Sequence, residues 1–234
     1  MTKPVKTSFI ASELSITRPY RLVLIFLFIA SLCVDKGMDV LWINGHYTVW
    51  LDSFFKTITN LGDGLIFIPI TLLALFIRFR YAIAAVAASV AHGLLISLFK
   101  RLLFPGLERP RKFLGDDLIH FVSGIDVHNA NSFPSGHTAT AFCAALFLAL
   151  LSRNKVIGIF ALLLATLVGY SRIYLAQHFL IDVAAGAVIG SFTTYIAWQI
   201  VEFNTLPAWM NRKLNIPSAF TNHKSQTLRL KVKR

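Results

Sequence analysis

Long apolar segments with almost no charged residues recur along this chain, and they constrain its fold more than any other feature. Six of them stand at 20–41, 64–79, 81–99, 138–151, 156–170 and 180–201. About 20 apolar residues can cross a bilayer as a helix, which pairs its own backbone polar groups. With 56% hydrophobic and 15% charged residues, the chain is also far from the composition of a soluble domain. We therefore expect an all-α bundle of six transmembrane helices.

Some boundaries of these segments are less regular than others. Asp35 and Lys36 interrupt the first segment near its end, and Arg80 alone separates the second from the third, which predicts a tight hairpin. The fourth and fifth segments are shorter than the roughly 20 residues that a crossing needs, so we expect the outer surface to be hollowed there. The stretch 40–61 carries tryptophans and phenylalanines beside Lys56, a pattern typical of an amphipathic piece at the membrane interface.

Charge is distributed unevenly between the two sides of the predicted bundle. With both termini in the cytoplasm, the inner side holds 15 of the 23 Lys and Arg but only two acidic residues, and the outer side holds the other eight with nine acidic ones. Cytoplasmic loops are enriched in Lys and Arg, so we expect this N-in, C-in orientation. The chain then divides into a cytoplasmic N-terminal segment (1–19), a six-span domain (20–203) and a basic cytoplasmic tail (204–234).

The net charge of +12 could indicate a nucleic-acid partner, but its distribution favours another interpretation. A cluster of Lys and Arg beside the last membrane segment is suited to anionic lipid headgroups. We expect the bilayer as the partner of the tail, and no nucleic acid. The oligomeric state stays open.

Three polar clusters all fall on the outer side of the predicted topology, although the spans are placed without reference to them. Basic residues follow the third segment, a second cluster opens the fourth segment, and a third leads into the sixth; these comprise Lys100, Arg101, Arg109, Asn131–His137 and Ser171–Asp182. Lysine and arginine side chains can together hold a multiply charged oxyanion, arginine through bidentate hydrogen bonds. Ser135 and the backbone N–H groups of Gly136 and His137 would open a helix, and helix N-termini bind phosphate through unpaired N–H groups.

Two histidines in these clusters have the partners that nucleophilic catalysis needs. His178 and Asp182 are four residues apart, so they would share a helix face if the last segment began there. A carboxylate behind an imidazole fixes its tautomer and raises its basicity. His178 is then the candidate nucleophile, and His137 is left as the general acid for the leaving oxygen.

These residues resemble the motifs of the type 2 phosphatidic acid phosphatase superfamily, which also includes vanadium haloperoxidases and bacterial membrane lipid phosphatases. The family pattern has three parts: Lys-x6-Arg-Pro, Pro-Ser-Gly-His and Ser-Arg-x5-His-x3-Asp. Residues 134–137 match the second part without change, and the third part matches at Ser171, Arg172, His178 and Asp182. The resemblance covers most of the chain from the second segment onward.

This sequence departs from the first part of the family pattern. Arg109 and Pro110 are present, but Leu102 stands where the lysine is expected, and Lys100 lies two residues earlier. Lys100 could reach a phosphate if two residues near 105–106 bulged out, and Arg101 is the alternative ligand. We favour Lys100, because the family has lysine in this role.

The resemblance implies a role for each matched residue. His178 would attack phosphorus and form a phosphohistidine, Asp182 would orient it, and His137 would protonate the leaving group. Phosphate would be bound by Lys100, Arg109, Ser135, Gly136 and Arg172. The resemblance implies no metal and no cofactor, since cationic side chains stabilise the charge that develops on the phosphoryl oxygens.

Other polar or small residues are more simply read as structural. We expect Cys33, Cys143, His46 and His92 to serve packing, and Gly186 with Gly190 to form a helix-packing face. The aspartates and His128 of the loop 113–132 could suggest a metal site, but their spacing fits no standard ligand set. We expect this loop to face the substrate.

The function expected from these observations is a metal-independent membrane phosphatase that acts on a lipid phosphate or pyrophosphate at the extracytoplasmic face. We expect it in a bacterial cytoplasmic membrane, with the site facing the periplasm or the outside. Undecaprenyl pyrophosphate, phosphatidylglycerophosphate, phosphatidic acid and lipid A phosphates are the candidate substrates. The alternatives are a vanadate-dependent haloperoxidase and a non-catalytic lipid-binding or transport protein on the same fold.

Overall fold

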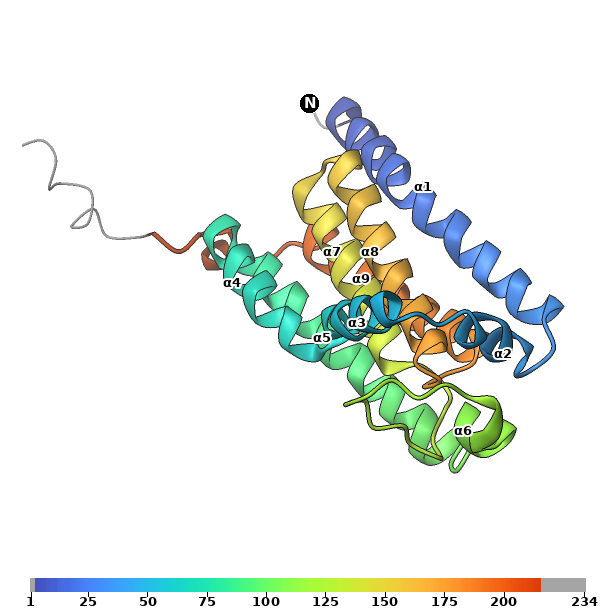
Figure 1. The fold of residues 1–234 in the computed structure, drawn as a ribbon. Coiled ribbons are helices and arrows are strands. Elements are labelled where there is room, and N and C mark those ends of the chain that lie inside the picture. The colour runs from blue at the N-terminus through green and yellow to red at the C-terminus, as the bar shows by residue number, and fades with distance from the viewer. Residues whose placement is uncertain (1–2, 216–234) are drawn as a thin grey trace, which may run out of the picture.

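The structure, a computed structural model, describes residues 3–215, with side chains from residue 12 onward. Helices joined by turns and irregular loops make up residues 3–215, and no β-strand occurs among them. The α-helices are α1 (Lys3–Cys33), α2 (Met38–Gly45), α3 (Val49–Ile58), α4 (Phe67–Ile77), α5 (Phe79–Leu98), α6 (Pro110–Leu114), α7 (Gly136–Ser152), α8 (Lys155–Tyr174) and α9 (Leu180–Phe203). Figure 1 shows α5, α7, α8 and α9 gathered in one bundle, with α1 along its side. The expected all-α architecture is confirmed.

Within the described residues, four stretches of helix are long and apolar enough to cross a membrane: Ser12–Cys33, Phe79–Leu103, Lys155–Tyr174 and Leu180–Phe203. A fifth crossing is present if Val49–Gly62 and Gly64–Ile77, which meet at a bend of 59°, count as one span. Helix α7 is apolar but has only 17 residues. The chain is thus a multi-pass membrane protein with four or five crossings by helix length, and six stays a prediction.

One expected boundary of the first span is wrong. Helix α1 begins at Lys3, before the expected start of that span at 20, and a separate cytoplasmic segment 1–19 stays a prediction. That span ends at Cys33 rather than near 41, since Gly37 adopts a left-handed conformation (φ +95°) and α2 starts anew. The second span starts at 64 as expected, where Asp63 accepts a hydrogen bond from the N–H of Leu65 (2.9 Å), and a short 3₁₀ turn, Gly64–Ile66, leads into α4.

One end of the bundle collects the connections that the sequence predicts to be cytoplasmic. Glu202 of α9 pairs with Arg80 at 3.4 Å and with Arg153 at 3.7 Å, which joins the α4–α5 and α7–α8 turns. The carboxylate of Glu13 accepts a hydrogen bond from Trp198 Nε1 (2.7 Å), which places the start of α1 at the same end. The expected tight hairpin is confirmed, with Arg78 alone between α4 and α5. The predicted tail lies outside the described residues from 216 onward.

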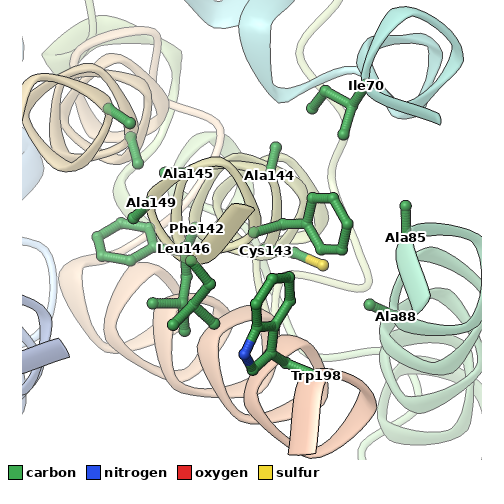
Figure 2. Packing of buried hydrophobic residues seen from close by; sticks show 14 of the residues in the cluster. Ile70, Ala85, Ala88, Phe142, Cys143, Ala144, Ala145, Leu146, Ala149 and Trp198 are labelled. Carbon is green, nitrogen blue, oxygen red and sulfur yellow. The ribbon is translucent and has the colours of Figure 1, made fainter. Parts of the chain in front are cut away.

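Helix α7 occupies the centre of the core. Figure 2 shows Cys143 on the side of α7 that faces Trp198 of α9 and Ala85 and Ala88 of α5, whereas Phe142 lies on the side of Ala149. Alanines predominate on these faces, so the helix backbones approach closely. At Gly190 of α9 an added Cβ would fall on the carbonyl oxygen of Ala139, which confirms the expected packing role of this glycine.

Candidate active site

A cavity of about 430 Å³ opens at the other end of the bundle, where α5 and α8 end and α7 begins. Its walls come from four parts of the chain that are distant in sequence. They comprise Thr59, Asn60, Lys100, Arg109, Gly124, Ile125, Asp126, His128, Gly136, His137, Arg172, Gln177 and His178. Six of the eight predicted site residues therefore line one cavity, and Ser135 and Asp182 lie behind its wall.

His178 precedes α9 rather than lying on it, because the helix begins at Leu180. The expected shared helix face is therefore wrong in detail, yet the two side chains still meet: His178 Nδ1 lies 3.4 Å from Asp182 Oδ2. The same oxygen accepts hydrogen bonds from the N–H of Phe179 (3.0 Å) and from Ser132 Oγ (2.5 Å). Asp182 thus caps its own helix and supports the histidine with one carboxylate.

The surroundings of His178 favour the neutral form of its imidazole ring. The side chain is buried, and burial lowers its pKa well below the usual value. The cationic side chains of Arg109, Arg172 and Lys100 add to this effect, because a second positive charge beside them is unfavourable. A neutral imidazole has a free lone pair at physiological pH, as a nucleophile requires.

The two arginines are held in place by hydrogen bonds that do not use their whole guanidinium groups. Arg109 donates from Nε to the carbonyl of Ala130 (3.0 Å) and from Nη1 to Gln177 Oε1 (2.9 Å). Arg172 is 7% exposed and donates from Nη1 to Thr59 Oγ1 (2.7 Å). Its Nε has no partner among the described residues, although a buried charged donor without an acceptor is costly. An oxyanion in the cavity would supply that acceptor.

The third cation of the cavity is Lys100, not Arg101. Residues Phe99–Leu103 form a π-helical turn after α5, closed by the hydrogen bond from Phe104 N to Phe99 O (2.8 Å). This wider turn directs Lys100 to the cavity while Arg101 is exposed outside it. The π-helical turn thus lets Lys100 reach the cavity although it stands two residues before the position of the lysine in the family pattern. That Lys100 binds phosphate stays a prediction.

Helix α7 opens at the cavity with Gly136 and His137 in its first turn. Ser135 is the N-cap, and its hydroxyl is 2.9 Å from Thr138 Oγ1 and accepts from Thr138 N at 3.4 Å. The structure therefore does not bring the Ser135 side chain to the cavity surface. Its predicted contact with phosphate would require the hydroxyl to leave the cap.

Several residues of the site are not signalled by the sequence. Thr59, Ser132 and Gln177 are neutral side chains that hold the charged ones. Ser132 and Gln177 stand within the polar clusters of the sequence, but no motif assigns a role to any of the three. In the loop 113–132, Gly124, Ile125, Asp126 and His128 line the cavity, and that this loop faces the substrate stays a prediction. Among the residues that the structure describes, no three His, Cys, Asp or Glu side chains are grouped to hold a metal ion.

Comparison with known proteins shows which family this chain belongs to. The PAP2 superfamily profile matches residues 65–206, which include every predicted site residue. The chain belongs to the PAP2 superfamily. Its relatives include a lipid A 4'-phosphatase of Bacteroides thetaiotaomicron, 30% identical over 70% of this chain and 75% of that protein. An undecaprenyl-diphosphatase of Sulfolobus acidocaldarius is 28% identical over 68% and 74% of the respective chains.

The fold of this chain is also similar to that of a solved structure. The crystal structure of LpxE from Aquifex aeolicus superposes with a TM-score of 0.59 at 30% identity, covering 68% of this chain and 92% of that one. The resemblance inferred from the three motifs is therefore confirmed, and the chain is a multi-pass membrane protein of a phosphatase superfamily.

Proposed function

We propose that this PAP2 protein hydrolyses a phosphomonoester or pyrophosphate of a membrane lipid through a phosphohistidine at His178. One observation carries the proposal: a buried imidazole, with a carboxylate at Nδ1, lines a cavity whose other walls bear Lys100, Arg109 and Arg172. These cations match the charge of a phosphoryl group. Because they are already positioned, little reorganisation is needed as charge develops on its oxygens.

The reaction divides into two steps at this geometry. In the first, Nε2 of His178 attacks phosphorus, the bond from phosphorus to the leaving oxygen breaks, and the imidazolium form of His137 gives that oxygen a proton. Burial and the neighbouring cations lower the pKa of His137 to about 4, so this protonated form depends on the negative charge of the bound phosphate, which raises the pKa again. Asp182 stabilises the positive charge that forms on the His178 ring. In the second, His137 takes a proton from water, the water oxygen attacks phosphorus, and the bond to His178 breaks, which releases inorganic phosphate.

The orientation of the site belongs to the same proposal. The turns that carry Arg78, Arg80, Arg153 and Lys155 lie at the end of the bundle opposite the cavity, and Lys and Arg favour the cytoplasmic side. With α7 counted as a sixth, shorter crossing, both termini are cytoplasmic and the cavity faces the periplasm or outside of a bacterial cytoplasmic membrane. The domain then spans 20–203, with 204–234 as a basic cytoplasmic tail.

The substrate is a lipid that keeps its tails in the bilayer and presents its phosphate at the end of α7. The relatives named above act on lipid A and on undecaprenyl diphosphate, so both a phosphomonoester and a pyrophosphate belong in the test. No described residue favours a haloperoxidase or a non-catalytic lipid carrier, and both are outcomes of the same experiment.

The test is phosphate release by the purified full-length protein in detergent, with phosphatidic acid, phosphatidylglycerophosphate, undecaprenyl diphosphate and a lipid A phosphate. We expect release from at least one lipid, in EDTA as in buffer, and none from His178→Ala. His137→Ala should lose more activity on lipids than on aryl phosphates, whose leaving groups need no proton. Release that requires an added metal, or that survives in His178→Ala, would contradict the proposal.

A further inference from the structure

A second cavity, of about 340 Å³, lies between α1, α7 and α9 and shares no lining residue with the candidate active site. Its walls include Thr17, Arg21 and Leu24 of α1, Leu146 of α7, and Ser191 of α9. Ser191 lies nine residues after Asp182, which is about 14 Å along the helix axis. The cavity therefore opens on the flank of the bundle, away from the phosphate site.

Two polar residues of α1, Tyr20 and Arg21, mark one end of this cavity. Tyr20 donates a hydrogen bond from its hydroxyl to the carbonyl of Gly158 (3.0 Å), which is one turn from the start of α8. Arg21 is the next residue, so it stands near the level of the α7–α8 turn, at the end opposite the active site. Leu24 and Leu146 continue the cavity toward the middle of the bundle. The lining thus changes from a cationic residue near the α7–α8 turn to apolar residues toward the middle of the bundle. A lipid has the same order, with a headgroup at the membrane surface and acyl chains inside.

Two groups of the lining lack a partner that suits them. Ser191 is 5% exposed, and its hydroxyl has no hydrogen-bond partner among the described residues. A buried hydroxyl without an acceptor is unfavourable, and more so where no water reaches it. Arg21 has no ion pair within residues 12–215, and its Nη2 donates a long hydrogen bond to the carbonyl of Leu14 (3.4 Å). An occupant with an anionic head and an ester carbonyl would satisfy both.

We propose that this cavity binds one anionic glycerophospholipid, with its phosphate on Arg21, an ester carbonyl accepting from Ser191, and an acyl chain along Leu24 and Leu146. The charge of Arg21 selects an anionic headgroup over a zwitterionic one. A lipid seated there bridges α1 to α7 and α9, so it stabilises the fold. Its assignment to the cytoplasmic leaflet rests on the orientation proposed above, whereas binding itself does not depend on the phosphatase activity.

The experiment compares dioleoyl phosphatidylglycerol with dioleoyl phosphatidylcholine on the delipidated full-length protein in detergent. Thermal unfolding measures stabilisation, and native mass spectrometry counts bound lipids on the folded protein. Phosphatidylglycerol should raise the unfolding temperature by several degrees and give a one-lipid adduct that phosphatidylcholine does not give. Arg21→Gln should abolish this difference, and Ser191→Ala should weaken it.

Arg18→Gln is the matched control, because Arg18 is an exposed arginine of the same helix that does not line the cavity. It should respond to phosphatidylglycerol like the unaltered protein. Equal effects of the two lipids, or an Arg21→Gln protein that still binds phosphatidylglycerol selectively, would overturn the proposal. Phosphate release is measured in parallel. Its absence in the unaltered protein would count against the proposed function alone. A failure to bind phosphatidylglycerol selectively would count against this lipid site alone.

Discussion

At the scale of single residues, the account depends on the protonation of His178. Burial and three neighbouring cations lower the pKa of this imidazole well below its usual value. The neutral form is the reactive one, so the nucleophile should stay available as the pH falls through 6.5, the ordinary pKa of histidine. Nitrogen NMR of the histidine-labelled protein, assigned with His178→Gln, should show this ring neutral at pH 6. A titration midpoint at or above 6.5 would contradict the electrostatic picture.

The cation of the first motif gives a second prediction at this scale. Lys100 lines the cavity and Arg101, one residue later, is exposed outside it. Charge-assisted contacts in a partly dehydrated site are stronger than surface contacts, so Lys100→Ala should cost on the order of 2–4 kcal/mol of transition-state stabilisation, read from kcat/KM. Arg101→Ala is the neighbouring control and should change kcat/KM little. The reverse order of effects would assign the phosphate to Arg101.

At the scale of helices, the position of His137 depends on how closely α9 approaches α7. A Cβ at Gly190 would fall on the backbone of Ala139, three residues after Gly136, so the helices would have to separate. Such overpacking costs about 1–3 kcal/mol, and Gly190→Ala should lower the unfolding temperature together with kcat. Gly93→Ala in α5 is the control, because nothing lies within 4 Å of its added Cβ. Equal unfolding temperatures for the two variants would argue against this packing.

Much of the site could be predicted at the helix scale because its residues occur in short motifs tied to helix ends. The Pro-Ser-Gly-His run opens α7, and the spacing of His178 and Asp182 brings them together across the start of α9. Thr59 and Gln177 could not be predicted, since each acts through one hydrogen bond to an arginine distant in sequence. The bend between α3 and α4 was missed because hydropathy does not register a 3₁₀ turn.

At the scale of the whole molecule, the open question is which end faces the cytoplasm. The proposed orientation puts the exposed Asp117 outside and the exposed Lys155 inside. In a Cys33→Ser background, which removes the exposed native thiol, Asp117→Cys should react with a membrane-impermeant maleimide in intact cells. Lys155→Cys should react only after the cells are permeabilised. The opposite pattern would invert the topology and place the active site in the cytoplasm.

The central claim is that a phosphohistidine forms at His178, and detecting this covalent intermediate is its most direct test. The purified protein is mixed with a phosphate-labelled lipid substrate, quenched in alkali within the first turnover, digested, and sequenced by mass spectrometry. Alkali is used because a phosphorus–nitrogen bond to histidine is labile in acid. We predict a phosphoryl group on His178 that disappears as phosphate is released, and none in His178→Ala. Turnover with no phosphoryl group on His178, or with the group on another residue, would contradict the account.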